Sequence, residues 1–205
     1  MSDNLALYIV ASLALILTPG QDMIYVIGRS LAQGRVAGLC SAIGVIIGIL
    51  VHTALAAIGV GAILQASETL FTVLKLAGAA YLVYLGIRMV LTREVAIDTS
   101  AGGARATRLR LVLQGVLSNV TNPKIILFFF AFLPQFVDPA SEHPTRNLIA
   151  LGVLYALLGL PVQCAVALIA ARLSDRMRRT PAALTWMNRA CGALLVALGV
   201  RLARG

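Results

Sequence analysis

Two short polar interruptions inside long apolar runs contain the residues best suited to chemistry. Thr18, Pro19, Gly20, Gln21 and Asp22 interrupt the run at 5–27, and Asn119, Asn122, Pro123 and Lys124 interrupt the run at 111–137. Proline removes a backbone hydrogen bond and breaks a helix. Because hydrocarbon offers no water to the freed backbone groups, a broken helix at membrane depth must be buried in protein or line a wet cavity. The two breaks carry opposite charges, which makes them a candidate substrate or ion pathway.

Asp22 is the only carboxylate in the apolar part of any run. An ionisable residue inside a membrane is costly unless it pairs, faces water or has a function. One reading therefore makes Asp22 a proton-coupling group or the counter-charge of a substrate amine. The other reading is an N-terminal cap of a half-helix beginning near Met23, where a carboxylate suits the helix dipole. We favour the functional reading, and the two roles are compatible.

Lys124 lies near the middle of its run, too deep to reach an interface, and so needs an anion. Asp22 is one candidate and a substrate carboxylate is the other. The backbone N–H groups that follow Pro19 and Gly20 also favour a carboxylate, because they form a helix N-terminus. Together these groups suit a zwitterionic substrate, with its amine at Asp22 and its carboxylate at Lys124.

The composition of the chain is that of an integral membrane protein. Of its 205 residues, 60% are apolar and 12% are charged, whereas soluble domains average about 45–50% and about 25%. The net charge of +9 comes mainly from arginines clustered between apolar runs. Such clusters are typical of cytoplasmic loops, and no aromatic and basic strip accompanies them, so nucleic acid is not an expected partner.

The apolar runs predict an all-α fold of six transmembrane helices, with the first and fourth broken. The expected spans are 5–27, 36–64, 70–91, 111–137, 147–171 and 184–202. A polar turn at 29–35, a turn at 65–68, a cytoplasmic linker at about 93–110, an acidic loop at 138–146 and a basic loop at 172–183 connect them. The sixth span has the weakest signal, because Arg189 interrupts it.

The two halves of the chain resemble each other. Residues 78–88 match residues 192–201 with one residue deleted, and Lys75 and Arg189 each precede the first glycine by three positions. Because three spans separate the copies, the halves must run through the membrane in opposite directions. We therefore expect one transporter domain over 1–205, built from inverted repeats at about 1–92 and 111–205, which is the plan of many secondary transporters.

Arginines are distributed unevenly between the two sides of this arrangement. The connections after the first, third and fifth spans hold Arg29, Arg35, Arg88, Arg93, Arg105, Arg108, Arg110, Arg172, Arg176, Arg178 and Arg179, and the other side holds Arg146, Arg201 and Arg204. The richer side is expected to be cytoplasmic. Both termini should then face outward.

Two glycine spacings and two lone polar residues can be interpreted either as structural or as functional. The glycine spacings at 34–38 and 44–48 allow close helix packing, and we favour packing inside the bundle over a homodimer interface. For His52 and Gln163 we favour a satisfied interhelical hydrogen bond over a role in transport.

Nothing in the sequence indicates an enzyme, a metal site or a cofactor. The two histidines are isolated and no glycine-rich phosphate loop is present. Cys40, Cys164 and Cys191 lie separately in apolar runs, where free cysteine behaves as a small hydrophobe. The alternatives to a transporter are a membrane-embedded redox protein, which needs paired cysteines, and a non-transporting scaffold, which gives no reason for two charged breaks.

The motif Thr18-Pro19-Gly20-x-Asp22 and the run Asn122-Pro123-Lys124-Ile-Ile-Leu-Phe-Phe resemble those of the LysE/RhtB family of amino-acid exporters. The family usually has a second proline where this chain has Gln21. The resemblance implies a carrier of the bacterial inner membrane that exports amino acids or close derivatives, driven by the proton gradient or the membrane potential, and often a dimer. The scarcity of acidic residues mildly favours a neutral substrate over a cationic one.

Overall fold

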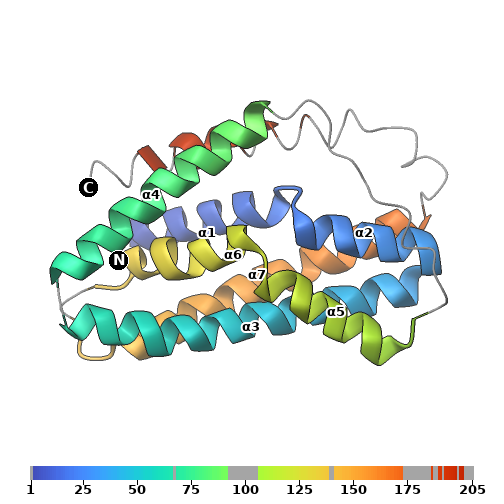
Figure 1. Cartoon of the computed structure of the whole chain (residues 1–205), viewed down its shortest axis with the longest axis horizontal. Helices are drawn as coiled ribbons and strands as arrows, with labels where there is room; N and C mark the ends of the chain where they lie inside the picture. Colours follow the sequence, from blue (N-terminus) through green and yellow to red (C-terminus); the bar gives the residue numbers. More distant parts are fainter. Residues whose placement is uncertain are drawn as a thin grey trace.

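The computed structural model describes residues 2–66, 68–91, 106–138, 141–172, 186, 189–190, 192–197 and 199–200. Every element in these residues is helical (Figure 1), which confirms the all-α fold. In chain order they are α1 (Ser2–Leu17), α2 (Gln21–Gln33), α3 (Arg35–Ala66), α4 (Glu68–Leu91), α5 (Arg108–Val120), α6 (Pro123–Leu127), the π-helix η1 (Phe128–Phe132), the 3-10 helix η2 (Leu133–Phe136) and α7 (Pro144–Arg172). The described residues after 185 are also helical.

The two breaks expected from the sequence are present. α1 and α2 meet at an angle of 46°, and α5 meets the segment Pro123–Phe136 at 53°. Pro19 lies between the first pair, and Pro123 is the first residue of α6. In each case proline cannot supply the N–H that would continue the helix. The predicted breaks in the first and fourth spans are therefore confirmed.

The number of spans agrees with the prediction only in part. Among the described residues, two helices are long and apolar enough to cross a membrane, Arg35–Gly59 within α3 and the whole of α7, or up to four if each bent pair counts as one span. α4 contains a shorter apolar stretch, Leu76–Leu91, and runs at a slant to the other helices in Figure 1. The third and sixth spans stay predictions.

Several boundaries differ from those expected. The predicted polar turn at 29–35 is wrong, because α2 continues to Gln33 and Gly34 alone makes the turn. Gly34 has φ +83°, a conformation that glycine adopts at no steric cost. α7 begins at Pro144, three residues before the expected start, since proline is well suited to the first helical position. α5 begins inside the predicted linker, at Arg108, with Thr107 as its N-cap.

Other expected connections are described only in part. Residues 65, 66 and 68 of the predicted turn are helical, while residue 67 lies outside the described residues. The same is true of most of the linker, at 92–105, and of the basic loop, at 173–185. The second half of the fourth span is not a regular α-helix: a short α-helix is followed by a π-helix and a 3-10 helix.

An aromatic cluster supports this irregular segment. Tyr8, Phe128, Phe129, Phe132 and Tyr155 are among the largest fully buried side chains. Their rings pack closely, with centroids 4.7 Å apart for Phe128 and Tyr155 and 5.0 Å apart for Phe128 and Phe132. The Tyr8 hydroxyl donates a hydrogen bond to the Leu151 carbonyl at 2.7 Å. The cluster thus joins α1, η1 and α7 beside the second break.

Glycines let α3 approach α5 closely enough to bring Asn119 into the centre of the bundle. A Cβ added to Gly44 would lie 2.9 Å from the Gly115 Cα, and one added to Gly48 would lie 2.6 Å from the Asn119 Cβ. There is no room for a side chain at either position. The 44–48 glycine spacing therefore serves packing inside the bundle, as favoured from the sequence, and does not supply a dimer surface.

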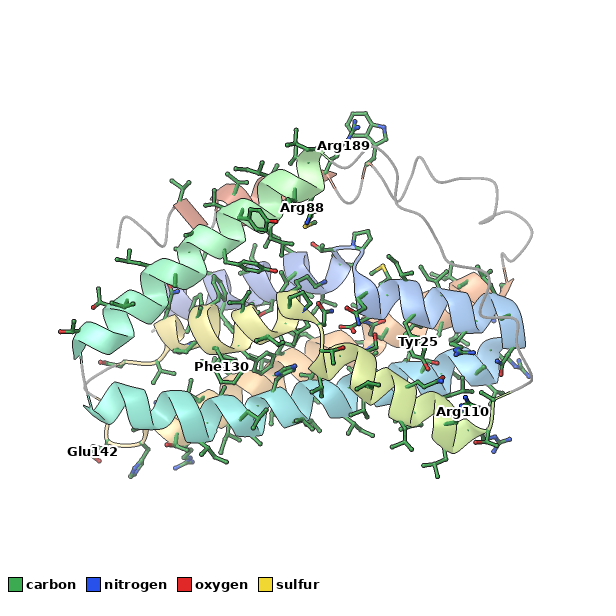
Figure 2. The ribbon with its side chains drawn as sticks, viewed as in Figure 1. Tyr25, Arg88, Arg110, Phe130, Glu142 and Arg189 are labelled. Carbon is green, nitrogen blue, oxygen red and sulfur yellow. The ribbon has the colours of Figure 1, made fainter. Side chains whose placement is uncertain are left out.

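The two ends of the molecule differ in charge. Figure 2 shows Arg110 near one end and Glu142 near the other. α3 begins at Arg35 and α7 ends at Arg172, both at the Arg110 end, where α2 also ends (Figure 1). The first of these arginines follows Gly34 directly, so the basic end contains the tight turn.

Candidate substrate site at the two helix breaks

The Asp22 carboxylate links the two breaks. It lies in the first turn of α2 and is 4% exposed. Its Oδ2 accepts hydrogen bonds from Asn119 Nδ2 at 2.8 Å and from Asn122 Nδ2 at 2.9 Å, and its Oδ1 accepts a longer one from Ser118 Oγ at 3.4 Å. All three donors come from the opposite break. Hydrogen bonds to an ionised carboxylate are roughly twice as strong as neutral ones, so Asp22 holds the half-helices together.

Asp22 does not cap α2. The N-cap residue is Gly20, and α2 has no side-chain cap. The strict cap reading of Asp22 is therefore wrong, because its carboxylate is turned towards α5 and α6. Its position in the first turn still suits the helix dipole.

Lys124 closes the end of α1. In an α-helix the N–H of residue 19 would bind the Leu15 carbonyl, but Pro19 has no N–H. Lys124 Nζ donates to that carbonyl at 3.1 Å and to the Thr18 carbonyl at 3.2 Å. An ammonium at a helix C-terminus is also favoured by the dipole. The sequence predicted that Lys124 needs an anion. In the structure its ammonium group instead donates hydrogen bonds to carbonyl groups of the first break, and its charge also acts on Asp22.

The second break is capped mainly by one of its own residues. Asn122 is the N-cap of α6, and its Oδ1 accepts from the Lys124 backbone N–H at 3.1 Å while its Nδ2 donates to Asp22. Pro123 leaves the Asn119 carbonyl without its helical donor. Asn122 N donates to that carbonyl at 3.0 Å, and His52 Nε2 of α3 lies 3.2 Å from it. Since a carbonyl only accepts, His52 Nε2 carries the proton. The interhelical hydrogen bond favoured for His52 is present.

Gln21 and Tyr25 connect α2 to α5 on the side of the basic end. Gln21 is exposed, and its Nε2 donates to the Ser118 carbonyl at 3.2 Å. One turn further, the Tyr25 hydroxyl donates to the Leu111 carbonyl at 2.9 Å (Figure 2). The Gln21 amide therefore bridges the two breaks.

A small cavity lies against the charged pair. Its volume is about 20 Å³, and Thr18, Asp22, Lys124, Tyr155 and Gln163 are among its lining residues. A space of this size holds about one water molecule. In this structure the cavity is therefore too small to hold an amino acid.

The structure brings together most of the residues singled out from the sequence. Asp22, Asn119, Asn122 and Lys124 meet at the breaks. Thr18 lines the cavity, and Gln21 donates a hydrogen bond to the Ser118 carbonyl. Pro19 and Gly20 form the first break, and Pro123 begins α6. Binding of substrate by these residues stays a prediction.

The sequence did not indicate Ser118 or Tyr155 at this place, and for Gln163 it favoured a structural hydrogen bond. Ser118 donates to Asp22, and Tyr155 and Gln163 of α7 line the cavity. Ser118 directly precedes Asn119, so its proximity was available from the sequence. The two α7 residues were not, because only tertiary packing brings α7 beside both breaks.

The described residues contain no group of three or more His, Cys, Asp or Glu that could hold a metal ion. Cys40 and Cys164 are free thiols, and Cys191 lies outside the described side chains. The site accordingly consists of two charges, amides, hydroxyls and helix ends.

The sequence is similar to a family of membrane carriers. A family model described as LysE type translocator matches residues 13–205. A membrane protein of Vibrio cholerae is 36% identical, with 96% of this chain and 94% of the relative covered. The homoserine/homoserine lactone efflux protein of Salmonella typhimurium is 33% identical over the same shares of each chain. The leucine efflux protein of Klebsiella pneumoniae is 34% identical, with 78% and 72% covered.

No solved structure matches this chain. The family match extends over both breaks and confirms the resemblance noted in the sequence. It identifies a transporter rather than an enzyme. The matched residues include both charged breaks and nearly the whole length of the chain. The protein therefore belongs to the LysE type translocator family.

Proposed function

We propose that the protein is a secondary transporter that exports amino acids or close derivatives across the bacterial inner membrane. Relatives named for efflux of homoserine, homoserine lactone and leucine support an amino-acid substrate. The observation that carries the proposal is the buried Asp22 carboxylate, held across the two breaks beside a cavity that Lys124 also lines. A neutral amino acid carries the complementary pair of charges.

The proposed pose places the substrate between the half-helices. Its ammonium group binds Asp22, and its carboxylate binds Lys124 and the first N–H groups of α2, which have no side-chain cap. Lys124 exchanges the carbonyls of Leu15 and Thr18 for the substrate carboxylate as the site opens. Binding thereby loosens the end of α1, which links substrate binding to movement of the first break.

In this proposal the Asp22 carboxylate also couples export to the uptake of protons. Asp22 binds either a substrate ammonium or a proton, so a proton taken up from outside displaces the substrate that is leaving. A buried ionisable group in a membrane commonly has such a relay role. Export is then driven by the proton gradient without any further ion.

The architecture that we propose is two inverted three-helix repeats with both termini outward. In support, the bent pair α1–α2 runs in the opposite direction to α5–α6 in Figure 1, and α3 runs opposite to α7. The two similar segments also pack closely against each other: a Cβ on Gly86 would lie 2.5 Å from the Gly192 carbonyl, and one on Gly199 would lie 2.8 Å from the Ala79 carbonyl. The arginines at one end favour a cytoplasmic location for that end.

The test is release of labelled amino acids from proteoliposomes with and without an imposed pH gradient. We expect gradient-dependent release by the wild type and none by Asp22→Asn, which keeps the size and polarity of the side chain but removes its charge. Glu142→Gln, an exposed change of the same kind, is the matched control. Wild-type release by a folded Asp22→Asn protein would refute the role of the carboxylate.

A further inference from the structure

The α7 side of the cavity contains a buried polar atom that the proposed charge pairing leaves out. Gln163 is 6% exposed, and its Oε1 has no hydrogen-bond partner among the described residues. The interhelical hydrogen bond expected for this amide from the sequence is therefore not found at its oxygen. A buried acceptor without a partner is destabilising, and native proteins leave few of them. The same side chain lines the cavity with Asp22 and Lys124.

Gly159 lies one helical turn before Gln163, on the same face of α7, and also lines the cavity. The three atoms nearest to a Cβ at this position would be the ends of flexible side chains, Ile46 at 3.5 Å, Ile49 at 3.8 Å and Ile16 at 3.9 Å. These are ordinary van der Waals distances. Gly159 is therefore not required for close backbone packing here, in contrast to Gly44 and Gly48, and its effect is to leave space.

We propose that Gly159 and Gln163 form the specificity-determining wall of the substrate site, in which Gln163 binds a neutral polar group on the substrate side chain and Gly159 sets the largest side chain accepted. This inference rests on the proposed function. Asp22 and Lys124 bind the ammonium and carboxylate groups that all amino acids share, so the side chain of the substrate is read by the residues that face them across the cavity.

The chemistry of an amide favours a hydroxyl as its partner. The Gln163 side chain offers an oxygen acceptor or, after rotation, an N–H donor, and a hydroxyl can pair with either. Apart from Tyr155, which carries a hydroxyl group, the residues beside Gln163 are apolar and include Ile16, Ile49 and the bare backbone of Gly159. A site of this composition accepts a short side chain ending in a hydroxyl better than the matching alkyl chain, because the alkyl chain leaves the amide unpaired.

The test compares two substrates of equal size, homoserine and norvaline, which differ by a hydroxyl in place of a methyl group. We expect wild-type proteoliposomes to release homoserine faster than norvaline. In Gln163→Leu the ratio of homoserine to norvaline release should fall about tenfold, the equivalent of one lost hydrogen bond. Leu157→Ala, on the exposed face of the same helix, is the control and should leave the ratio unchanged.

Two further readouts separate recognition from a structural role. If Gln163 awaits a substrate, Gln163→Leu removes an unpaired buried amide, and the substrate-free protein should unfold at the same or a higher temperature. If the amide supports the fold, the variant unfolds at a lower temperature.

Gly159→Ala should slow release of leucine more than release of alanine, since the added methyl group occupies the side-chain space.

The outcomes distinguish this inference from the proposed function. A changed ratio with retained thermal stability supports the α7 wall. Active transport by Gln163→Leu with an unchanged ratio overturns the wall and leaves the exporter function intact. A folded wild-type protein that releases no amino acid overturns the proposed function and the inference together.

Discussion

The two breaks look alike in the sequence but are completed differently in the structure. Each contains a proline, and their angles are similar, at 46° and 53°. The second break uses its own Asn122 as a cap. The first has no side-chain cap on α2, and its carbonyls at Leu15 and Thr18 bind Lys124 from the second break. The first break thus depends on the second, whereas the second is largely self-sufficient.

This asymmetry suggests which half-helices move. The contacts between the two breaks are two hydrogen bonds from a flexible lysine, three to Asp22 and one from Gln21 to the Ser118 carbonyl. In the proposed pose, the substrate replaces those of Lys124 and Asp22. The second break is also fixed by His52 of α3 and by the glycine contact between α3 and α5. We therefore expect α1 and α2 to separate around a more rigid support formed by α3, α5 and α7.

Removing the lysine should give the largest effect. In Lys124→Met the carbonyls at the end of α1 lose their donor, which should destabilise the protein by about 1–3 kcal/mol and abolish export. Thermal unfolding in detergent and substrate release from proteoliposomes measure the two effects. Arg110→Met, an exposed change at the basic end, should alter neither. A Lys124→Met protein as stable as the wild type would show that the first break does not need this cap.

Two N-caps offer a matched pair for the second break. Asn122 caps α6 and also binds Asp22, while Thr107 caps α5 and accepts from the Arg110 N–H at 3.3 Å. Replacing either by alanine should cost about 1 kcal/mol of stability. Only Asn122→Ala should also slow release, by about tenfold, because one donor to the carboxylate is lost. Equal release rates for the two variants would mean that Asn122 is no more than a cap.

The smallest effect is expected at Gln21, where the resemblance noted in the sequence implies a proline. Gln21 is the first residue of α2, a position that accepts proline, and Gly20 before it is extended, as a residue preceding proline should be. Gln21→Pro should therefore change stability by no more than about 0.5 kcal/mol. Gln21→Ala separates loss of the hydrogen bond to Ser118 from addition of the ring. If Gln21→Ala changed export and Gln21→Pro did not, the expectation that this position has only a small effect would be contradicted.

The breaks were predictable because their cause is local. Proline and glycine inside an apolar run interrupt a helix whatever surrounds them, so Pro19 and Pro123 could be interpreted from the sequence. The loss of a donor to Leu15 also follows from helix geometry. That Lys124 replaces this donor does not, because it depends on how α6 packs against α1.

Features that depend on packing were not predictable. The sequence of η1 reads as an ordinary apolar helix, and its wide turn accompanies the contacts of Phe128 with Tyr8 and Tyr155. Gln163 is a single amide in a long apolar run, so the sequence could not show that its oxygen faces a cavity. The end of α2 was misplaced because Arg29 was interpreted as the start of a turn, whereas its guanidinium binds Gln114 of α5 at 3.0 Å.

The π-helix at Phe128–Phe132 allows this part of the chain to change in length. A π-helical turn contains about one residue more than an α-helical turn. Deleting one residue there would let the wide turn tighten to an α-helical one, while the residues on either side keep their faces. Phe136, whose ring centroid lies 5.1 Å from that of Tyr8, would then stay against the aromatic cluster. The same deletion in α7, which is α-helical throughout, would rotate everything after it by about 100° and should disturb the packing more.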